Sequence, residues 1–210
     1  PTSPREHIRA RAERLRDYQN QALADRFRTL VDRIEDEDLR QALAEGYYKL
    51  LAYKDEYEVA RLHAQNIERM VAETFDTPGK IEFHLAPPML PGKDAQRRPK
   101  KRRFGPWVLP LFKLMARGKF LRGTWADPFG RTAERRMERA LIAQYEADME
   151  EVLAGLTSAR REIAIMLARL PLDIRGFGPV KHKYALAAAK RREELLAAFR
   201  AGGTAKAAAD

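Results

Sequence analysis

Apolar residues recur every three to four positions through the first 34 residues, which is the spacing of one face of an amphipathic helix. They are Ile8, Ala12, Leu15, Ala22, Phe27, Leu30 and Ile34. Ser3, Pro4 and Glu6 supply an N-cap, a proline for the first turn and the glutamate of a capping box. The pattern predicts one long helix that begins near Ser3 and ends before the acidic run 35–38, a run that suits the positive end of a second helix.

The same spacing continues from Leu39 to Val71, and Thr77, Pro78 and Gly79 would stop that second helix. We therefore expect residues 1–79 to form an antiparallel hairpin of two long helices. The tyrosines on successive turns after residue 46 indicate a packed, hydrogen-bonded seam.

The pattern changes between residues 80 and 130, where prolines and glycines interrupt it. Residues 81–85 alternate in polarity like a short strand, and residues 101–104 could return beside them as the second strand of a β-hairpin. A short apolar helix is expected over 106–115. The segment is therefore predicted to be an irregular, basic insertion.

Helical spacing resumes in residues 131–201. It predicts three helices: one from Thr132 to Gly155, one capped by Thr157 and closed by Pro171, and one from Pro179 to Phe199. We expect these helices to pack on the N-terminal hairpin, so that the chain is one mainly α domain, followed by a disordered tail over 202–210.

The net charge of +10 is concentrated in one stretch. No acidic residue lies between Asp94 and Asp127, and without the ten basic residues of that stretch Lys+Arg and Asp+Glu would balance at 30 each. These candidate anion- or partner-binding residues are Arg97, Arg98, Lys100, Lys101, Arg102, Arg103, Lys113, Arg117, Lys119 and Arg122. With Phe104, Trp107 and Phe112 they could bind the phosphates of CoA, an acidic protein such as a ferredoxin, or nucleic acid, or form a solvated loop. Nucleic acid is disfavoured because no zinc-finger, RRM or KH signature is present.

Two further groups of charges are candidates for a structural network. Arginines at the start of the helix from Thr132 are unfavourable with its dipole, so carboxylates near 55–58 are expected to face them, with an anionic ligand or another domain as the alternative. Asp55 and Glu58, three residues apart on a predicted helix, could also form a carboxylate site. The network would comprise Lys54, Asp55, Glu56, Glu58, Arg61, Arg131, Glu134, Arg135, Arg136 and Arg139.

The sequence offers no self-sufficient catalytic motif. It has no cysteine for a cluster or a thiolate, its four histidines are scattered, and it has no phosphate-binding loop. No apolar run approaches the roughly 18 residues of a membrane span, so we expect a soluble, cytoplasmic protein. The chain opens at Pro1 rather than Met, which fits a processed product or an excised fragment.

Seven strings in order resemble a known family: KDEYEVARL at 54–62, FHLAPP at 83–88, FGPW at 104–107, LRGT at 121–124, DPFG at 127–130, TAERRMER at 132–139 and IRGFGPVK at 174–181. Together they resemble the C-terminal domain of the fused bacterial indolepyruvate:ferredoxin oxidoreductases, over nearly the whole chain. The resemblance implies a parent enzyme that converts aryl-pyruvates to acyl-CoA and reduces ferredoxin, with thiamine diphosphate, Mg²⁺ and iron–sulfur clusters in other domains.

No catalytic, cofactor-binding or metal-binding residue of that family can be placed on this chain. We therefore expect an accessory domain, without a cofactor of its own, that packs on the other domains of a homo-oligomeric oxidoreductase and could meet ferredoxin or CoA through its basic stretch. The alternative is a free-standing basic helical module that binds an acidic protein or nucleic acid.

Overall fold

The computed structural model describes residues 3–53, 83–85, 102–105, 107–122 and 130–203, except 177, together with 55, 57–58, 60–61, 124 and 126–127. The chain divides into two compact units, and each is described by itself. Unit 1 comprises residues 1–53 and 122–210, and unit 2 comprises residues 54–121. The mainly α fold expected from the sequence is confirmed.

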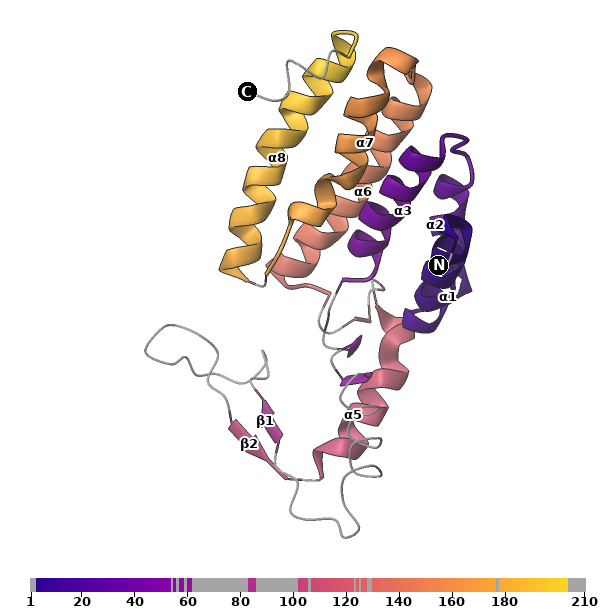
Figure 1. The fold of residues 1–210 in the computed structure, drawn as a ribbon. Helices are drawn as coiled ribbons and strands as arrows, with labels where there is room; N and C mark the ends of the chain where they lie inside the picture. The colour runs from indigo at the N-terminus through magenta and orange to yellow at the C-terminus, as the bar shows by residue number, and fades with distance from the viewer. Residues whose placement is uncertain are drawn as a thin grey trace. The chain divides into compact units, whose positions relative to one another are not determined.

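Unit 1 begins with three helices, α1 (Pro4–Tyr18), α2 (Gln21–Val31) and α3 (Glu37–Leu51). The predicted capping box starts α1: the backbone N–H of Glu6 donates to Ser3, and the backbone N–H of Ser3 donates to Glu6. Asp36 caps α3 by accepting from the backbone N–H of Leu39 at 2.9 Å. All three helices pack on one another (Figure 1).

The single helix predicted to run from Ser3 to Ile34 is wrong. The chain breaks at Gln19, and Asn20 begins α2 because its side chain accepts from the backbone N–H of Leu23 at 3.0 Å. Asparagine offers the backbone this alternative to continuing a helix. The break lets α1 and α2 pack side by side, so both apolar faces are buried in one core.

The second long helix is also shorter than predicted. It ends at Leu51, and Ala52 has a non-helical ψ of 47°. Tyr53 turns away to meet α1, and Asp55 accepts from the backbone N–H of Glu58 at 2.8 Å, which is the pattern of a new N-cap. The helical spacing assumed across residues 47–61 is therefore not continuous, and residues 62–79 of the predicted hairpin lie outside the described part of the chain.

The rest of unit 1 consists of α6 (Ala133–Ala154), α7 (Arg161–Arg169) and α8 (Pro179–Arg200), with short 3₁₀ turns η2 (Ser158–Arg160) and η3 (Leu170–Asp173) around α7. Thr132 caps α6 and Pro179 begins α8, as predicted. The predicted cap at Thr157 is wrong: its side chain makes no capping bond, and η2 intervenes before α7. Figure 1 shows α3, α6, α7 and α8 side by side, with α8 at the edge.

The helix α3 lies at the centre of unit 1 and contacts α1, α2, α6 and α7. Its contact with α7 is close because Gly46 has no side chain: a Cβ there would lie 2.1 Å from the carbonyl oxygen of Ala168. The predicted aromatic seam is confirmed at Tyr47, whose ring is buried and stacks between those of Phe27 and Tyr145.

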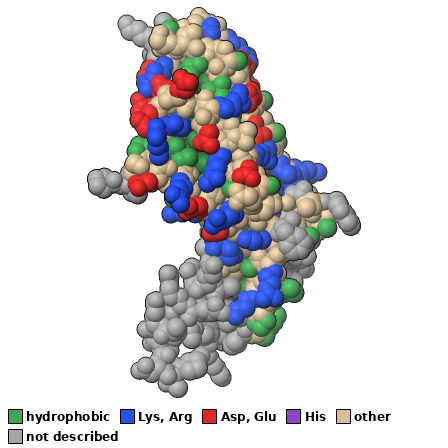
Figure 2. All heavy atoms as spheres, turned by 90° about the vertical axis from the view of Figure 1, so that its right-hand side faces the viewer, with side chains coloured by type: hydrophobic (Ala, Val, Ile, Leu, Met, Phe, Trp, Pro, Cys, Tyr) green, Lys and Arg blue, Asp and Glu red, His purple; other side chains and the backbone are tan. Residues whose placement is uncertain are grey.

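Ion pairs join the helices of unit 1 around this core. Arg26 and Arg33 of α2 pair with Glu146 and Glu150 of α6, and Arg161 at the start of α7 binds Asp36 before α3. Figure 2 shows Lys or Arg and Asp or Glu interspersed on the face of this unit that it presents. Such exposed pairs contribute at most about 1 kcal/mol each, so they fix helix positions more than they stabilise the fold.

In unit 2, the strands β1 (Phe83–Leu85) and β2 (Arg102–Phe104) form the β-hairpin expected from the sequence. They are antiparallel, with Phe83 opposite Phe104. The expected short helix is α5 (Val108–Arg117), followed by the 3₁₀ turn η1 (Gly118–Leu121). Among the described residues, no helix has the length and apolar character needed to cross a membrane.

Candidate functional site

The chain leaves unit 1 after Tyr53 and re-enters it at Arg122, and both residues contact Tyr18 at the end of α1. The Tyr18 hydroxyl donates to the carbonyl of Tyr53 at 2.7 Å, and the two rings meet edge-on at 6.4 Å. Arg122 Nη1 donates to the carbonyl of Tyr18 at 2.9 Å, and its guanidinium carbon lies 3.7 Å from the Tyr18 ring centroid. We call Tyr18, Tyr53 and Arg122 the Tyr18 clamp.

The chemistry of the clamp follows from the end of α1. The last four carbonyls of a helix have no partner within it, and the helix dipole makes that end negative. The carbonyl of Tyr18 is one of these, so a buried guanidinium that also stacks on the Tyr18 ring is a well-matched partner. Arg122 is only 5% exposed and Tyr18 is equally buried, so the contact is shielded from water.

A second buried network adjoins the clamp through Arg135 of α6. Its guanidinium carbon lies 5.2 Å from the Tyr53 ring centroid, and its Nη1 donates to Glu138. Glu138 also accepts a hydrogen bond from Lys181 of α8. Lys181 lies in the first turn of α8, where the positive end of the helix dipole makes a cation unfavourable. Because Glu138 is 3% exposed, its two cationic partners are what make its burial tolerable.

The contacts of α6 can now be compared with the charge network predicted from the sequence. Arg139 donates to the carbonyl of Gly130 at 2.7 Å, whereas Arg131 and Arg136 are exposed. Glu138 of the same helix, which was not among the predicted residues, accepts a hydrogen bond from Arg135. Glu134 lies 3.5 Å from the backbone N–H of Gly178.

The other half of the predicted network lies in unit 2. Arg61 donates through Nε and Nη2 to both carboxylate oxygens of Glu58, at 2.8 and 2.6 Å, and Asp55 is buried. Lys54 and Glu56 lie outside the described residues. That the carboxylates near 55–58 face the arginines of α6 therefore stays a prediction.

The ten predicted anion-binding residues are placed differently from one another. Arg97, Arg98, Lys100 and Lys101 lie outside the described residues, and Arg102 is placed by its backbone alone, in β2. Arg103, Lys113 and Arg117 are exposed, and Lys119 is half-buried. Arg122 is buried in the Tyr18 clamp, so its guanidinium interacts with groups of unit 1.

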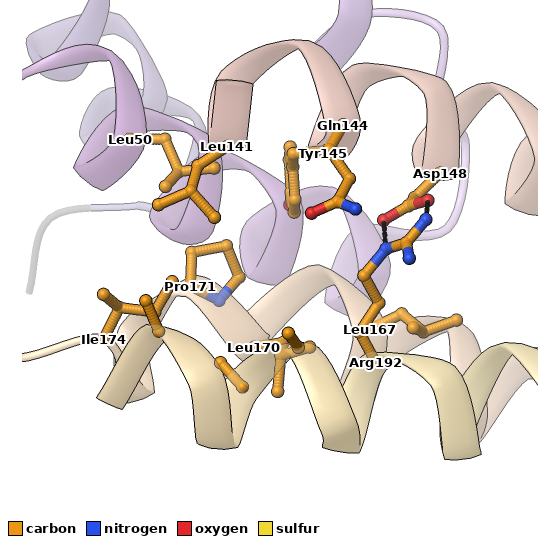
Figure 3. A pocket seen from close by; sticks show the side chains of 13 residues that line it. Leu50, Leu141, Gln144, Tyr145, Asp148, Leu167, Leu170, Pro171, Ile174 and Arg192 are labelled. Carbon is orange, nitrogen blue, oxygen red and sulfur yellow. Dashed lines mark hydrogen bonds and ion pairs between the residues drawn. The ribbon is translucent and has the colours of Figure 1, made fainter. Parts of the chain in front are cut away.

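A small cavity lies between α3, α6, α7 and α8, and Figure 3 shows its lining. Its wall is mostly apolar, with Leu50, Leu141 and Pro171 on one side, and the bidentate pair of Asp148 and Arg192 closes one edge. A volume of about 40 Å³ admits water and is far below that of a small-molecule site.

The groove between α2 and α6 is larger, at about 320 Å³, and is lined by paired charges. Tyr47 donates its hydroxyl to Glu146 at the floor of this groove. Burial, together with that hydrogen bond and the negative charge of Glu146, raises the pKa of Tyr47. The phenol therefore stays a hydrogen-bond donor at neutral pH. Within the described part of the chain, no group of three or more His, Asp or Glu side chains could hold a metal ion.

Sequence reasoning missed Tyr18 and Lys181, which hold the two buried networks together. Tyr18 lies two residues before Asn20, so recognising the Asn20 cap would have placed it at a helix end. Lys181 gave no comparable signal, because its partner is 43 residues away on another helix.

Comparison with known sequences identifies a family that the chain matches. The model of a family described as a family of unknown function (DUF6537) matches residues 4–194, which is most of the chain. No curated protein and no solved structure matches it.

Proposed function

The chain belongs to this family of unknown function, and from that premise we propose that it is an accessory domain whose helical bundle holds the two ends of a basic insertion. The Tyr18 clamp carries the proposal. One buried residue, Tyr18, contacts both points at which the chain passes between unit 1 and unit 2: its hydroxyl binds Tyr53, and its ring and its backbone carbonyl bind Arg122. These contacts keep the two ends of the insertion at one place on unit 1.

The charged residues of unit 1 and those of unit 2 have different surroundings, which supports different roles for the two units. In unit 1, the buried carboxylates Glu138 and Asp148 of α6 pair with Lys181 and Arg192 of α8, so these two helices are tied together as a support. In unit 2, Arg103, Lys113 and Arg117 are exposed in a stretch without acidic residues. Exposed cations in a stretch of one sign of charge attract an anionic partner.

The sequence resemblance supports a parent enzyme for this accessory domain. It would be an indolepyruvate:ferredoxin oxidoreductase-like protein, with thiamine diphosphate, Mg²⁺ and iron–sulfur clusters bound in other domains. The basic insertion would then meet the acidic ferredoxin or the phosphates of CoA. In this proposal the present chain contributes no residue to the chemical step.

The first test is the length of the native gene product, measured by immunoblot against this domain. A band several times larger than the 24.1 kDa of this chain would support the fused enzyme. A band near that mass would contradict the fusion, and a free-standing binding module would then be the better description.

The second test is made in the full-length enzyme. Replacing Lys113→Glu together with Arg117→Glu should raise the KM for ferredoxin or CoA about tenfold at low salt and weaken its salt dependence, because exposed charges act on encounter rates. The matched control is Lys183→Glu with Lys190→Glu, which reverses two exposed cations of α8. Unchanged KM values for both substrates would refute a role of the insertion in meeting them.

A further inference from the structure

The helix α5 carries an apolar stripe that faces solvent. Trp107, Leu111 and Leu114 follow one another at i, i+4 and i+7, and they are 64%, 44% and 67% exposed. Another face of the helix is used for folding, because Val108 and Phe112 are buried. Three large apolar side chains on one exposed helix face have the spacing by which helices recognise one another.

Trp107 is held in place although it is exposed. Its ring meets the ring of Phe104 edge-on, with centroids 5.8 Å apart and an interplanar angle of 65°. An aromatic side chain that is already ordered loses little conformational freedom on binding, which is why such residues are often the anchors of protein interfaces. The α5 stripe, meaning Trp107, Leu111 and Leu114, therefore includes a preformed anchor.

Two cations border the α5 stripe along one side. Lys113 and Arg117 are four residues apart and both exposed, so they lie on one line along the helix. No acidic residue occurs between Asp94 and Asp127, and Figure 2 shows basic and apolar side chains next to each other on the described part of unit 2. The surface is an apolar stripe with a positive edge.

We propose that the α5 stripe binds an acidic amphipathic helix of a partner protein, with Trp107, Leu111 and Leu114 against its apolar face and Lys113 and Arg117 against its carboxylates. A second copy of this chain is a poorer occupant, because it would bring the same cations to the same edge. Nucleic acid is also poorer, because two of the three stripe residues are leucines, which do not stack on bases. The inference rests on the proposed function only in treating unit 2 as the partner-facing part.

The experiment uses the 210-residue chain and a fluorescent designed helix of about five turns, with Leu on one face and Glu on the other. Fluorescence anisotropy should show saturable binding in the micromolar range that weakens as NaCl is raised from about 50 to about 300 mM. The same peptide with Lys in place of Glu should bind at least about tenfold more weakly, because it meets Lys113 and Arg117.

Two variant pairs locate the site. Leu111→Ser with Leu114→Ser should weaken peptide binding at least about tenfold. The matched control, Val180→Ser with Leu186→Ser, removes two exposed apolar side chains of α8 and should leave binding unchanged. Both variants should keep the wild-type circular dichroism spectrum, because the substituted side chains are exposed.

The proposal is overturned if the acidic peptide does not bind, or if the α8 control weakens binding as much as the α5 variant. It is also overturned if the peptide is not bound while vesicles of phosphatidylcholine with about a quarter phosphatidylglycerol, or duplex DNA, bind in a way that the α5 variant abolishes. These outcomes are independent of the parent enzyme: a native band near the mass of this chain would refute the fusion and leave peptide binding to be judged by itself.

Discussion

Replacing Arg122 by methionine tests the Tyr18 clamp most directly. Methionine keeps an unbranched apolar stem of similar length, so the packing around the stem is largely preserved. It removes the guanidinium that donates to the carbonyl of Tyr18 at 2.9 Å and stacks on the Tyr18 ring at 3.7 Å. The change therefore isolates the polar part of the clamp.

The expected loss follows from these two contacts. A hydrogen bond from a charged donor contributes about 1.5–3 kcal/mol, and its loss leaves a buried helix-terminal carbonyl unsatisfied. A desolvated cation–π contact contributes about 1–2 kcal/mol. Because the contributions share one side chain and are not fully additive, we expect Arg122→Met to destabilise the protein by about 3 kcal/mol.

The assay is urea denaturation of the 210-residue chain, followed by far-ultraviolet circular dichroism, which reports mainly on helices. The matched control is Arg136→Met, which removes an exposed arginine of α6 and should change the free energy of unfolding by less than about 0.5 kcal/mol. A third variant, Tyr18→Phe, removes only the hydroxyl that binds the carbonyl of Tyr53 and should cost about 1 kcal/mol.

The clamp is refuted if Arg122→Met is no more destabilised than Arg136→Met. It is weakened as a device for holding both crossing points if Tyr18→Phe is as stable as the wild type. A change in the slope of the urea dependence, rather than in its midpoint, would show that the variant alters the surface exposed on unfolding or no longer unfolds in two states.

Three other perturbations test the packing of unit 1. Gly46→Ala should destabilise the protein by about 2–3 kcal/mol in urea denaturation, because the new Cβ would lie 2.1 Å from the carbonyl oxygen of Ala168. In an exposed helix the same change would stabilise by about 1 kcal/mol, so an unchanged urea midpoint would contradict the close contact. Glu138→Gln should cost about 3 kcal/mol in the same assay, because it removes the buried negative charge that Arg135 and Lys181 both bind. A variant as stable as the wild type would show that the network is not stabilising. Arg161 holds the pKa of Asp36 below its usual range, so this pair stabilises the fold above about pH 4 and loses that contribution as the pH falls through the lowered pKa. The urea midpoint of Asp36→Asn should therefore change less between neutral pH and pH 3 than that of the wild type, and an equal change would refute the assignment.

Helix ends that depend on neighbouring residues could be predicted from the sequence. The Ser3 capping box, the Thr132 cap and the proline at the start of α8 each act within one turn of the chain, so the residues that decide them lie side by side in sequence. The β-hairpin of residues 83–85 and 102–104 was also predicted, because its alternating polarity is local.

The breaks after Tyr18 and Leu51 could not be predicted from periodicity alone, because the apolar spacing continues across both. The first break has a local signal only in the Asn20 cap, and α1 then folds back on α2. At the second break, Tyr53 turns to reach Tyr18, 35 residues earlier. Tertiary contacts of this kind override local helix propensity.

The sequence by itself determined the helical class of this protein, the helix starts at Ser3, Thr132 and Pro179, and the concentration of its positive charge in one stretch, because composition and short-range spacing carry that information. Only the tertiary structure decided what the charges do. Arg122 belongs to the same basic run as Lys113 and Arg117, yet it is buried on Tyr18 while they are exposed. The fate of a charge depends on which distant groups the fold brings within a few ångströms, and one-dimensional spacing does not contain those distances.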